Sequence, residues 1–354
     1  MGNPTAAKKN AAALAAWFAK AQRPLPWRAD YHPYQVWVSE IMLQQTRVEA
    51  VLPYFARWMR QFPNLQSLAQ ATEPELLKAW EGLGYYSRVR NLALAAKGLV
   101  AAGTGIPPTA EELRRLPGIG PYTAAAIASI AFLQPVPLLD GNVKRVFARL
   151  LDWAEAVEAK SSETRFLELG ASLLAGQSPR VINQGLMELG ALVCNPKNPQ
   201  CPVCPLAEGC LSLAQGTQAQ RPVKKAKPEV IKHHLDYGIL LHQGRVFLQQ
   251  QPLGQLWAGM WLFPLTQALA LPWPTAPLAQ FRYHVTRYQV TAQAFLLSCP
   301  QPPPGLPPGQ WFDPNELHQL ALPRPGFLIR HALASSSADL PQPSLNATPS
   351  AANP

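Results

Sequence analysis

The chain has no long hydrophobic run, because no stretch approaches the roughly 18 apolar residues that a membrane-spanning helix requires. Cysteine is scarce, with five residues in all, and four of them lie together near position 200, so a disulfide framework is not expected. Acidic residues number 21 against 31 Lys and Arg, for a formal net charge of +10. Such a charge favours a polyanionic partner, nucleic acid before an anionic membrane surface, although a merely basic soluble protein would fit equally well.

Two further absences concern particular segments. Residues 237–312 contain no Asp or Glu, so they lack the carboxylates with which a nucleotide pyrophosphohydrolase holds Mg²⁺. The segment Ala11–Ala19, which follows Lys8 and Lys9, faintly imitates a signal peptide but has no small-residue cleavage site after it. The spacing of its apolar residues predicts an amphipathic helix instead.

Four cysteines form the most informative cluster in the chain. Cys194, Cys201, Cys204 and Cys210 are separated by gaps of six, two and five residues. Four clustered thiolates without histidine suit either a zinc ion or an iron–sulfur cluster. A zinc site usually has two Cys-x-x-Cys pairs, whereas only one close pair is present, so the spacing favours a 4Fe–4S cluster. An exposed cluster also favours a reducing compartment, and we expect the cytoplasm.

The pattern of apolar residues changes along the chain. Residues 8–214 have helical periodicity and few strand signals, so this part is expected to be all-α. Gln215–Lys232 is polar and basic and is interpreted as a linker. Strand alternation follows in Tyr237–Leu241 and Val246–Gln250, which flank a hairpin signal, and again in Phe281–Phe295.

One predicted turn has the features of a phosphate-binding hairpin. Thr109–Glu112 has the form of a capping box that opens a helix running to Leu116. Pro117–Gly120 then makes a tight turn, and Pro121 is well placed to begin the next helix. Backbone N–H groups exposed beside a helix N-terminus can bind phosphate without reading sequence. An ordinary connection between two helices is the alternative.

Two carboxylates have contrasting sequence environments. Glu40 lies among apolar residues of a predicted helix, where its pKa would be raised, although it could also be a first-turn glutamate favoured by the helix dipole. Asp140 precedes Gly141-Asn142 and could simply be a helix N-cap. A proton-holding carboxyl together with an ionised one is the usual apparatus for cleaving a glycosidic bond.

In combination these motifs resemble the endonuclease III superfamily of base-excision DNA glycosylases, and within it the MutY-like adenine glycosylases. The order is helix–hairpin–helix, the aspartate Asp140, then Cys-x6-Cys-x2-Cys-x5-Cys. The segments Leu25–Arg28, Ser39–Thr46 and Glu81–Arg88 also carry the resemblance. It extends densely over residues 22–212 and loosely over 230–330.

The resemblance implies a multidomain protein. An all-α helix-hairpin-helix glycosylase core with a 4Fe–4S cluster would be followed by a C-terminal α+β Nudix-like domain that recognises the mispair. Leu256–Pro264 matches the characteristic turn of that domain. The glycosylase region is expected over 1–214, with a six-helix subdomain at 24–136 and a cluster subdomain formed by 1–23 and 137–214. It would be followed by a linker at 215–232, the Nudix-like domain at 233–332 and a disordered tail at 333–354.

The resemblance also implies an activity and roles for residues. The enzyme would remove adenine mispaired with 8-oxoguanine or guanine in double-stranded DNA, after flipping the base out of the duplex. Glu40 would protonate adenine N7, and Asp140 would stabilise the oxocarbenium-like sugar, with Asn142 and Tyr122 in support. The DNA contacts would be the adenine pocket of Leu25, Trp27, Arg28 and Gln184, the wedge residues Gln44 and Tyr85, and the phosphate hairpin of Pro117, Gly118 and Gly120.

Tyr122 separates this interpretation from its nearest rival. Bifunctional relatives have a lysine at this position, whose amine attacks the sugar and leads to strand cleavage. Tyrosine cannot form a Schiff base, so little or no lyase activity is expected, beyond a trace from a lysine such as Lys144. The alternatives are an endonuclease III-like glycosylase and lyase acting on damaged pyrimidines, and a non-catalytic iron–sulfur DNA-binding protein.

The chain departs from the family at one segment. Where relatives often have Phe-Ser-His to probe 8-oxoguanine, this chain aligns Val285-Thr286-Arg287. Thr286 retains a hydroxyl, whereas Arg287 has a fixed charge in place of an imidazole, so discrimination between 8-oxoguanine and guanine could differ.

A monomer associated with the nucleoid and not with a membrane is expected.

Overall fold

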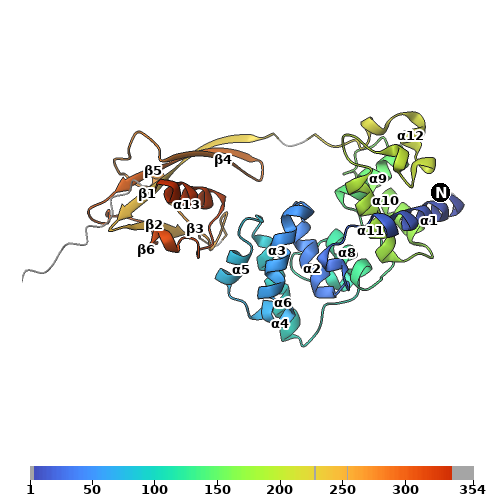
Figure 1. Cartoon of the computed structure of the whole chain (residues 1–354), viewed down its shortest axis with the longest axis horizontal. Helices are drawn as coiled ribbons and strands as arrows, with labels where there is room; N and C mark the ends of the chain where they lie inside the picture. Colours follow the sequence, from blue (N-terminus) through green and yellow to red (C-terminus); the bar gives the residue numbers. More distant parts are fainter. Residues whose placement is uncertain (1–3, 227–228, 253, 337–354) are drawn as a thin grey trace, which may run out of the picture. The chain divides into compact units, whose positions relative to one another are not determined.

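A computed structural model describes residues 4–226, 229–252 and 254–336. The contacts between residues divide the chain into two compact units (Figure 1). Unit 1 comprises Met1–Ala71 and Ser87–Lys227, and unit 2 comprises Thr72–Tyr86 and Pro228–Pro354. Within the described ranges, no helix combines the length and the apolar character that a membrane crossing demands.

Unit 1 is built from helices, as the periodicity predicts, and it has no strand among its described residues. Its described residues also form four short 3-10 turns, at Pro26–Arg28, Cys201–Val203, Ala207–Gly209 and Gln218–Gln220. The helices are α1 (Pro4–Ala21), α2 (Pro33–Leu43), α3 (Val48–Gln61), α4 (Leu65–Gln70), α6 (Ser87–Ala101), α7 (Ala110–Leu113), α8 (Pro121–Ala131), α9 (Gly141–Leu150), α10 (Lys160–Leu174), α11 (Pro179–Leu192) and α12 (Leu211–Gln215).

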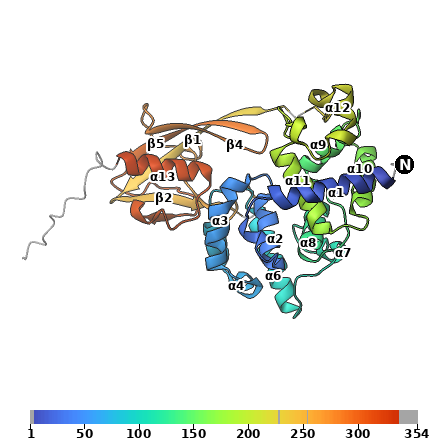
Figure 2. The same cartoon turned by 45° about the vertical axis from the view of Figure 1, so that its right-hand side comes forward.

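Helices α8 and α11 hold the core of unit 1 together. Helix α8 is rich in alanine and buries nearly its whole length against α2 and α11. Helix α1 packs on α10 and α11 (Figure 2). It is the amphipathic helix expected near the N-terminus, because Ala11, Leu14 and Phe18 are at most 3% exposed and recur at helical spacing.

The predicted hairpin lies between α7 and α8. The Thr109 hydroxyl caps α7 by accepting a hydrogen bond from the Glu112 backbone N–H, 3.3 Å away. The helix ends at Leu113, three residues earlier than expected. The chain then continues through turns to Gly118, whose φ of +76° favours glycine. A Cβ at Gly118 would approach the Asn91 Cβ to 2.6 Å, so close packing also requires glycine there.

Unit 2 contains a mixed sheet with one helix across it, in accord with an α+β domain (Figures 1 and 2). The strand order is β3-β2-β1-β5-β4, with β6 paired to β2; β1 and β5 are parallel, and the other pairs are antiparallel. The elements are α5 (Glu73–Ala79), β1 (Ile231–His242), β2 (Arg245–Gln250), β3 (Trp261–Leu262), β4 (Ala279–Val285), β5 (Tyr288–Ser298), β6 (Gln310–Phe312) and α13 (Arg324–Ser336), with 3-10 turns at Thr266–Ala268 and Pro314–Glu316.

The core of unit 2 lies between the sheet and α13. Tyr237, Ala292, Ile329 and Leu333 are buried together in it. The predicted β1–β2 hairpin is confirmed, and Gly244 in its turn has a φ of +75°. Helix α13 extends through Ser336, and the rest of the expected tail lies outside the described residues.

The strand alternation expected over Phe281–Phe295 is confirmed and is divided between two strands. The segment is two strands, β4 and β5, which pair with each other and are joined by the two-residue turn of Thr286 and Arg287. Thr286 adopts a φ of +51°, which is uncommon for a β-branched residue. The alternation continues through the turn without Gly, Pro or Asn, so the sequence has no local signal for a reversal there.

Candidate active site

A pocket of about 440 Å³ opens in unit 1 among α2, α8, α9 and α11. Such a volume is in the range of small-ligand sites. The pocket brings together eight predicted site residues from five separate parts of unit 1, and these are Leu25, Trp27, Arg28, Glu40, Tyr122, Asp140, Asn142 and Gln184.

Glu40 is a deeply buried acid of the pocket. It lies in the last turn of α2, where it is 3% exposed and accepts a hydrogen bond from the Tyr122 hydroxyl at 2.9 Å. Burial raises the pKa of Glu40 to about 7; the Tyr122 hydrogen bond and Arg28 oppose this rise, while the nearby charge of Asp140 adds to it. The first turn of α2 has no acidic residue, so the interpretation of Glu40 as a dipole-favoured first-turn glutamate is wrong.

Asp140 is the N-cap of α9 and lines the same pocket. One carboxylate oxygen accepts from the Val143 backbone N–H at 2.6 Å, and the other accepts from the Asn142 amide at 3.0 Å. Burial raises the pKa of Asp140, but both hydrogen bonds and the positive charge of Arg145 stabilise its ionised form. Asp140 therefore caps α9 and lines the pocket at the same time. Two hydrogen-bond donors stabilise its ionised form, whereas burial favours the neutral form of Glu40.

Tyr122 lies near both carboxylates and is a neutral donor to Glu40. Burial and the charges of Glu40 and Asp140 raise the pKa of its hydroxyl well above the ordinary value, so the proton stays on the oxygen. Among the described residues that line the pocket there is no lysine. Tyr122 therefore offers a hydrogen bond at this position and no amine nucleophile.

A buried ion-pair network holds Arg28 at the wall of the pocket. The Arg28 guanidinium donates to the Gln184 side-chain oxygen at 2.8 Å and to a Glu188 carboxylate oxygen at 3.1 Å. Arg23 also donates to Glu188, at 2.9 Å. Burial alone would raise the pKa of Glu188, but the hydrogen bonds from Arg23 and Arg28 outweigh it and lower that pKa to about 2.

Sequence reasoning missed Glu188, Arg23 and Arg88. Glu188 follows Gln184 by one helical turn of α11, and a charged residue on that apolar face was the available signal. Arg88 is 9% exposed, and its guanidinium donates to the backbone carbonyls of Ile41, Met42 and Gln44 at 2.6 to 3.1 Å. It thereby caps the C-terminal end of the helix that carries Glu40.

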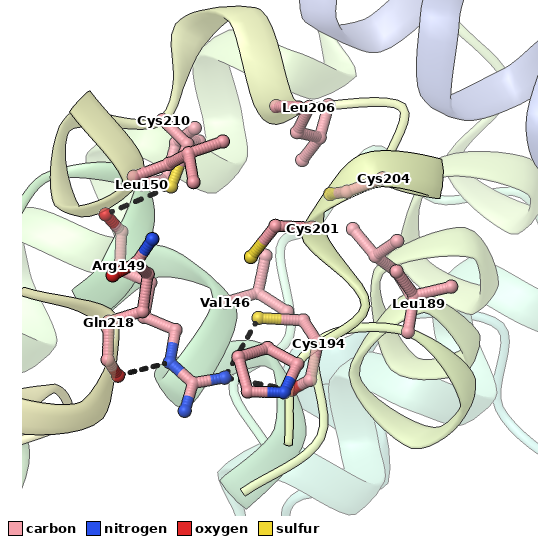
Figure 3. Close-up of a pocket in the computed structure, with 14 residues that line it drawn as sticks. Val146, Arg149, Leu150, Leu189, Cys194, Cys201, Cys204, Leu206, Cys210 and Gln218 are labelled. Carbon is pink, nitrogen blue, oxygen red and sulfur yellow. Dashed lines mark hydrogen bonds between the residues drawn. The ribbon is translucent and has the colours of Figure 1, made fainter. Parts of the chain in front are cut away.

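The four clustered cysteines line one cavity, together with the apolar side chains of Val146, Leu150, Leu189 and Leu206 (Figure 3). Within the described chain, no three His, Cys, Asp or Glu side chains are arranged to hold a single metal ion. The thiols instead surround a shared space with apolar walls (Figure 3). This donor set fits a thiolate-ligated cluster larger than one ion.

Two buried arginines of α9 hold the cysteine-bearing loop. Arg149 is 2% exposed, and its guanidinium donates to the backbone carbonyls of Asn195 and Pro196, at 2.8 and 3.0 Å. It also donates to the Cys194 sulfur at 3.4 Å (Figure 3). Arg145 donates to the Cys194 carbonyl and to the Asn142 side-chain oxygen, both at 2.8 Å. The cysteine site and the Asp140 cap are therefore connected through one residue.

Comparisons with known proteins agree with this geometry. The profile of the HhH-GPD superfamily of base excision DNA repair proteins matches residues 38–171, and that of the NUDIX domain matches residues 236–329. An adenine DNA glycosylase of Buchnera aphidicola subsp. Schizaphis graminum is 31% identical over 324 residues, which cover 86% of this chain and 92% of the relative. The chain belongs to the adenine DNA glycosylase family. It is thus a base-excision repair enzyme.

Other relatives and solved structures match parts of this glycosylase. The human adenine DNA glycosylase is 41% identical over 246 residues, which cover 63% of this chain and 44% of the human protein. A thermostable thymine-DNA glycosylase superposes with a TM-score of 0.55 at 24% identity, over 60% of this chain and 98% of the other. A non-covalent endonuclease III–DNA complex gives 0.50 at 22% identity, over 62% and 100%. These structures support the fold of unit 1.

The remaining predicted site residues of the glycosylase lie outside the pocket. The Gln44 amide donates to the Thr123 hydroxyl at 3.1 Å, just after α2. Tyr85 is 49% exposed on the loop before α6. Thr286 and Arg287 form the exposed turn between β4 and β5, and the Arg287 guanidinium lies 5.5 Å from the centre of the Tyr288 ring.

Proposed function

We propose that the enzyme removes adenine mispaired with 8-oxoguanine or guanine in duplex DNA, by hydrolysing the N-glycosidic bond of a flipped adenosine. The observation that carries this proposal is the pairing of Glu40, with a pKa of about 7, and Asp140 in one pocket. A base inside the stack is out of reach of such a pair, so the nucleotide must rotate out of the duplex. Binding to DNA accords with the family and with the basic charge of the chain.

Glu40 supplies the proton in this mechanism. At neutral pH a large fraction of Glu40 is protonated, and the Tyr122 hydroxyl fixes the orientation of the carboxyl group. The proton passes to adenine N7 while the bond between C1′ and N9 breaks and leaves its electron pair on the base. The base therefore departs as a neutral molecule, which lowers the barrier to cleavage.

Asp140 stabilises the sugar once the base begins to leave. Its carboxylate is held by Val143 and Asn142, so little reorganisation is needed when positive charge develops at C1′. Water then adds at C1′ and gives up a proton, which restores the Glu40 carboxyl through solvent, completes hydrolysis and leaves an abasic sugar. A transient covalent bond from Asp140 to C1′ is the other route open to the same carboxylate.

The wall formed by Leu25, Trp27 and Arg28 suits the flipped base. Trp27 is 5% exposed and packs edge-on against Phe55, so its position is fixed. Arg28 is held by Glu188 and Gln184 and presents a planar donor to the base. Since Tyr122 stands where bifunctional relatives have lysine, we propose base removal without strand cleavage.

Cys194, Cys201, Cys204 and Cys210 would hold a 4Fe–4S cluster in the apolar cavity that they line. When bound, such a cluster would cross-link the loop after α11. Base removal is a hydrolysis, so it needs no electron transfer from the cluster. We propose that this loop, together with Pro117, Gly118 and Gly120 of the hairpin, contacts DNA phosphates.

Residues outside the pocket would read the mispair. We propose that Gln44 and Tyr85 wedge into the duplex and that Thr286 and Arg287 face the oxidised guanine. We also propose the domain boundaries expected from the sequence, with a Nudix-like recognition domain at 233–332. The enzyme would act at the nucleoid in the cytoplasm.

Single-turnover cleavage tests the proposal directly. Duplexes with one central adenine opposite 8-oxoguanine, guanine or thymine are incubated with enzyme and analysed with and without alkali. We expect alkali-dependent cutting opposite 8-oxoguanine and guanine, abolished by Asp140→Asn. Asp313→Asn is the matched control, because Asp313 also caps a turn by accepting a backbone N–H but lies exposed in unit 2. Cutting without alkali, or none at any adenine by folded enzyme, would overturn the proposal.

A further inference from the structure

A short piece of the N-terminal half belongs to unit 2. Residues Thr72–Tyr86, which hold α5 and the loop after it, group with the C-terminal domain in the division of contacts. The loop ends at Tyr85 and Tyr86, directly before α6 resumes unit 1 at Ser87. The C-terminal domain therefore contacts a segment separated from it by more than 140 residues of chain.

Side chains and backbone groups of four residues contribute to this attachment, and we name them the clasp: Lys78, Glu81, Leu320 and Leu322. The Lys78 ammonium donates to the Leu320 backbone carbonyl at 3.0 Å and pairs with the Glu81 carboxylate. The other oxygen of that carboxylate accepts from the Leu322 backbone N–H at 3.1 Å. The Glu81 side chain is only 13% exposed, so these bonds are partly shielded from water and are stronger than a surface ion pair.

The C-terminal side of the clasp is fixed to the sheet. The Trp261 backbone N–H at the start of β3 donates to the Ala321 carbonyl at 3.0 Å. Leu322 is 1% exposed and belongs to the core between the sheet and α13. The clasp therefore joins the loop before α6 to a rigid part of the domain.

The loop that the clasp holds has an unusual backbone. Gly82, Gly84 and Tyr85 have φ values of +99°, +70° and +48°, which glycine adopts readily but tyrosine adopts rarely. The Trp80 indole N–H donates to the Gly84 carbonyl at 3.1 Å, and this bond closes the loop. Tyr85 at its end is 49% exposed, although large aromatic side chains are usually buried.

We propose that Lys78 and Glu81 are positioning residues through which the C-terminal domain sets the place of Tyr85 in the duplex. The inference rests on the proposed function, in which Tyr85 stacks against bases beside the mispair. An aromatic ring stabilises DNA by stacking only when it is aligned with a base plane. Because Glu81 lies four residues before Tyr85 and is bonded to the C-terminal domain, movement of that domain displaces the ring. Recognition of the guanine strand and insertion of Tyr85 are thus mechanically coupled.

A double-mutant cycle tests the clasp. Glu81→Ala, Tyr85→Ala and the double variant are compared with the wild type in single-turnover excision of adenine opposite 8-oxoguanine. We expect Glu81→Ala to lower the rate about tenfold, in the range of a lost charged hydrogen bond. In the Tyr85→Ala background the same change should have almost no effect, because the clasp acts through Tyr85. Glu168→Ala is the matched control, since Glu168 forms an exposed ion pair with Arg165 and should leave the rate unchanged.

Amide hydrogen exchange of the free protein supplies a readout that needs no substrate. Glu81→Ala should increase exchange at Leu322 and over residues 82–86, while Glu81→Gln, which keeps an acceptor for the Leu322 N–H, should increase it less. Unchanged exchange in Glu81→Ala, or rate effects of Glu81→Ala and Tyr85→Ala that simply multiply, would overturn the clasp. Failure of the wild type to excise adenine would overturn the proposed function instead, and exchange would still decide whether the clasp holds the loop.

Discussion

The Glu40 carboxyl group is buried, and it accepts a hydrogen bond from the Tyr122 hydroxyl. Its pKa rises from an ordinary 4.5 to about 7 in the folded protein. Between these values the folded chain retains a proton that the unfolded chain has released, so stability falls as pH rises through this window. Above about pH 7 the folded protein must hold the charged carboxylate in a site that disfavours it.

Glu40→Gln should therefore stabilise the protein while it abolishes function. At pH 8 we expect a gain of up to about 3 kcal/mol in the free energy of unfolding, which vanishes near pH 4, where the wild-type carboxyl is neutral in both states. The excision rate at pH 7 should fall by about three orders of magnitude, since the general acid is lost. Urea unfolding at both pH values measures the first effect, with the exposed Glu168→Gln as control. A stability difference independent of pH would contradict the raised pKa.

The sequence indicated the environment of Glu40 but not its partner. The apolar residues around it in α2 predict burial, and burial predicts a raised pKa. Tyr122 lies 82 residues away, and no local pattern indicates that its hydroxyl donates to Glu40. The same holds for Glu188, which meets Arg28 across 160 residues.

At the scale of elements, the crossing of α9 and α11 sets the geometry of Asp140. Gly190 of α11 faces Asn142 in the first turn of α9, and a Cβ at Gly190 would lie 2.6 Å from the Asn142 Cβ and 3.1 Å from its Cα. These contacts involve backbone, so the two helices would have to move apart. Asn142 donates to Asp140, and a shift of α9 would carry the carboxylate with it.

Gly190→Ala should therefore weaken both stability and excision. We expect a loss of about 1–3 kcal/mol in the free energy of unfolding, typical of overpacking, and at least a tenfold lower single-turnover rate. Gly98→Ala in α6 is the control, because a Cβ at Gly98 meets nothing within 4 Å and replacement of a helical glycine should stabilise by up to about 1 kcal/mol. Thermal unfolding and the excision assay distinguish the two variants, and wild-type activity of Gly190→Ala would contradict close packing as the cause.

Elements with local signals were predicted well, and elements without them were not. The Thr109 cap, the Gly118 turn and the Pro121 helix start follow from side chains within a few residues of each terminus. The turn at Thr286 and Arg287 has no such residues. It is recognised only from the pairing of β4 with β5 on either side of it. The place of the reversal is therefore seen in the pairing of Val285 with Tyr288 and in no turn-forming residue.

For the whole molecule, the net charge of +10 predicts that DNA binding depends on salt. We expect the affinity for a duplex to fall steeply between 50 and 200 mM salt, by about 10³-fold or more if six phosphates are contacted, because counterions are released on binding. Fluorescence anisotropy on mispaired and fully paired duplexes measures both slopes. Equal slopes indicate that the mispair is read through uncharged contacts. An affinity independent of salt would show that phosphate contacts do not dominate binding.

The sequence by itself determined the chemistry available to this protein: four cysteines at cluster spacing, a hairpin of glycines, and two carboxylates in different settings. It also determined the order of a helical region followed by strands, because caps, periodicity and ligand spacing depend on residues close together in the chain. Only the tertiary structure decided that Tyr122 meets Glu40, that Glu188 holds Arg28, and that Glu81 accepts from Leu322, 241 residues away. Such bonds form only when complete helices and strands have packed, so they depend on the whole core and on no single stretch of sequence.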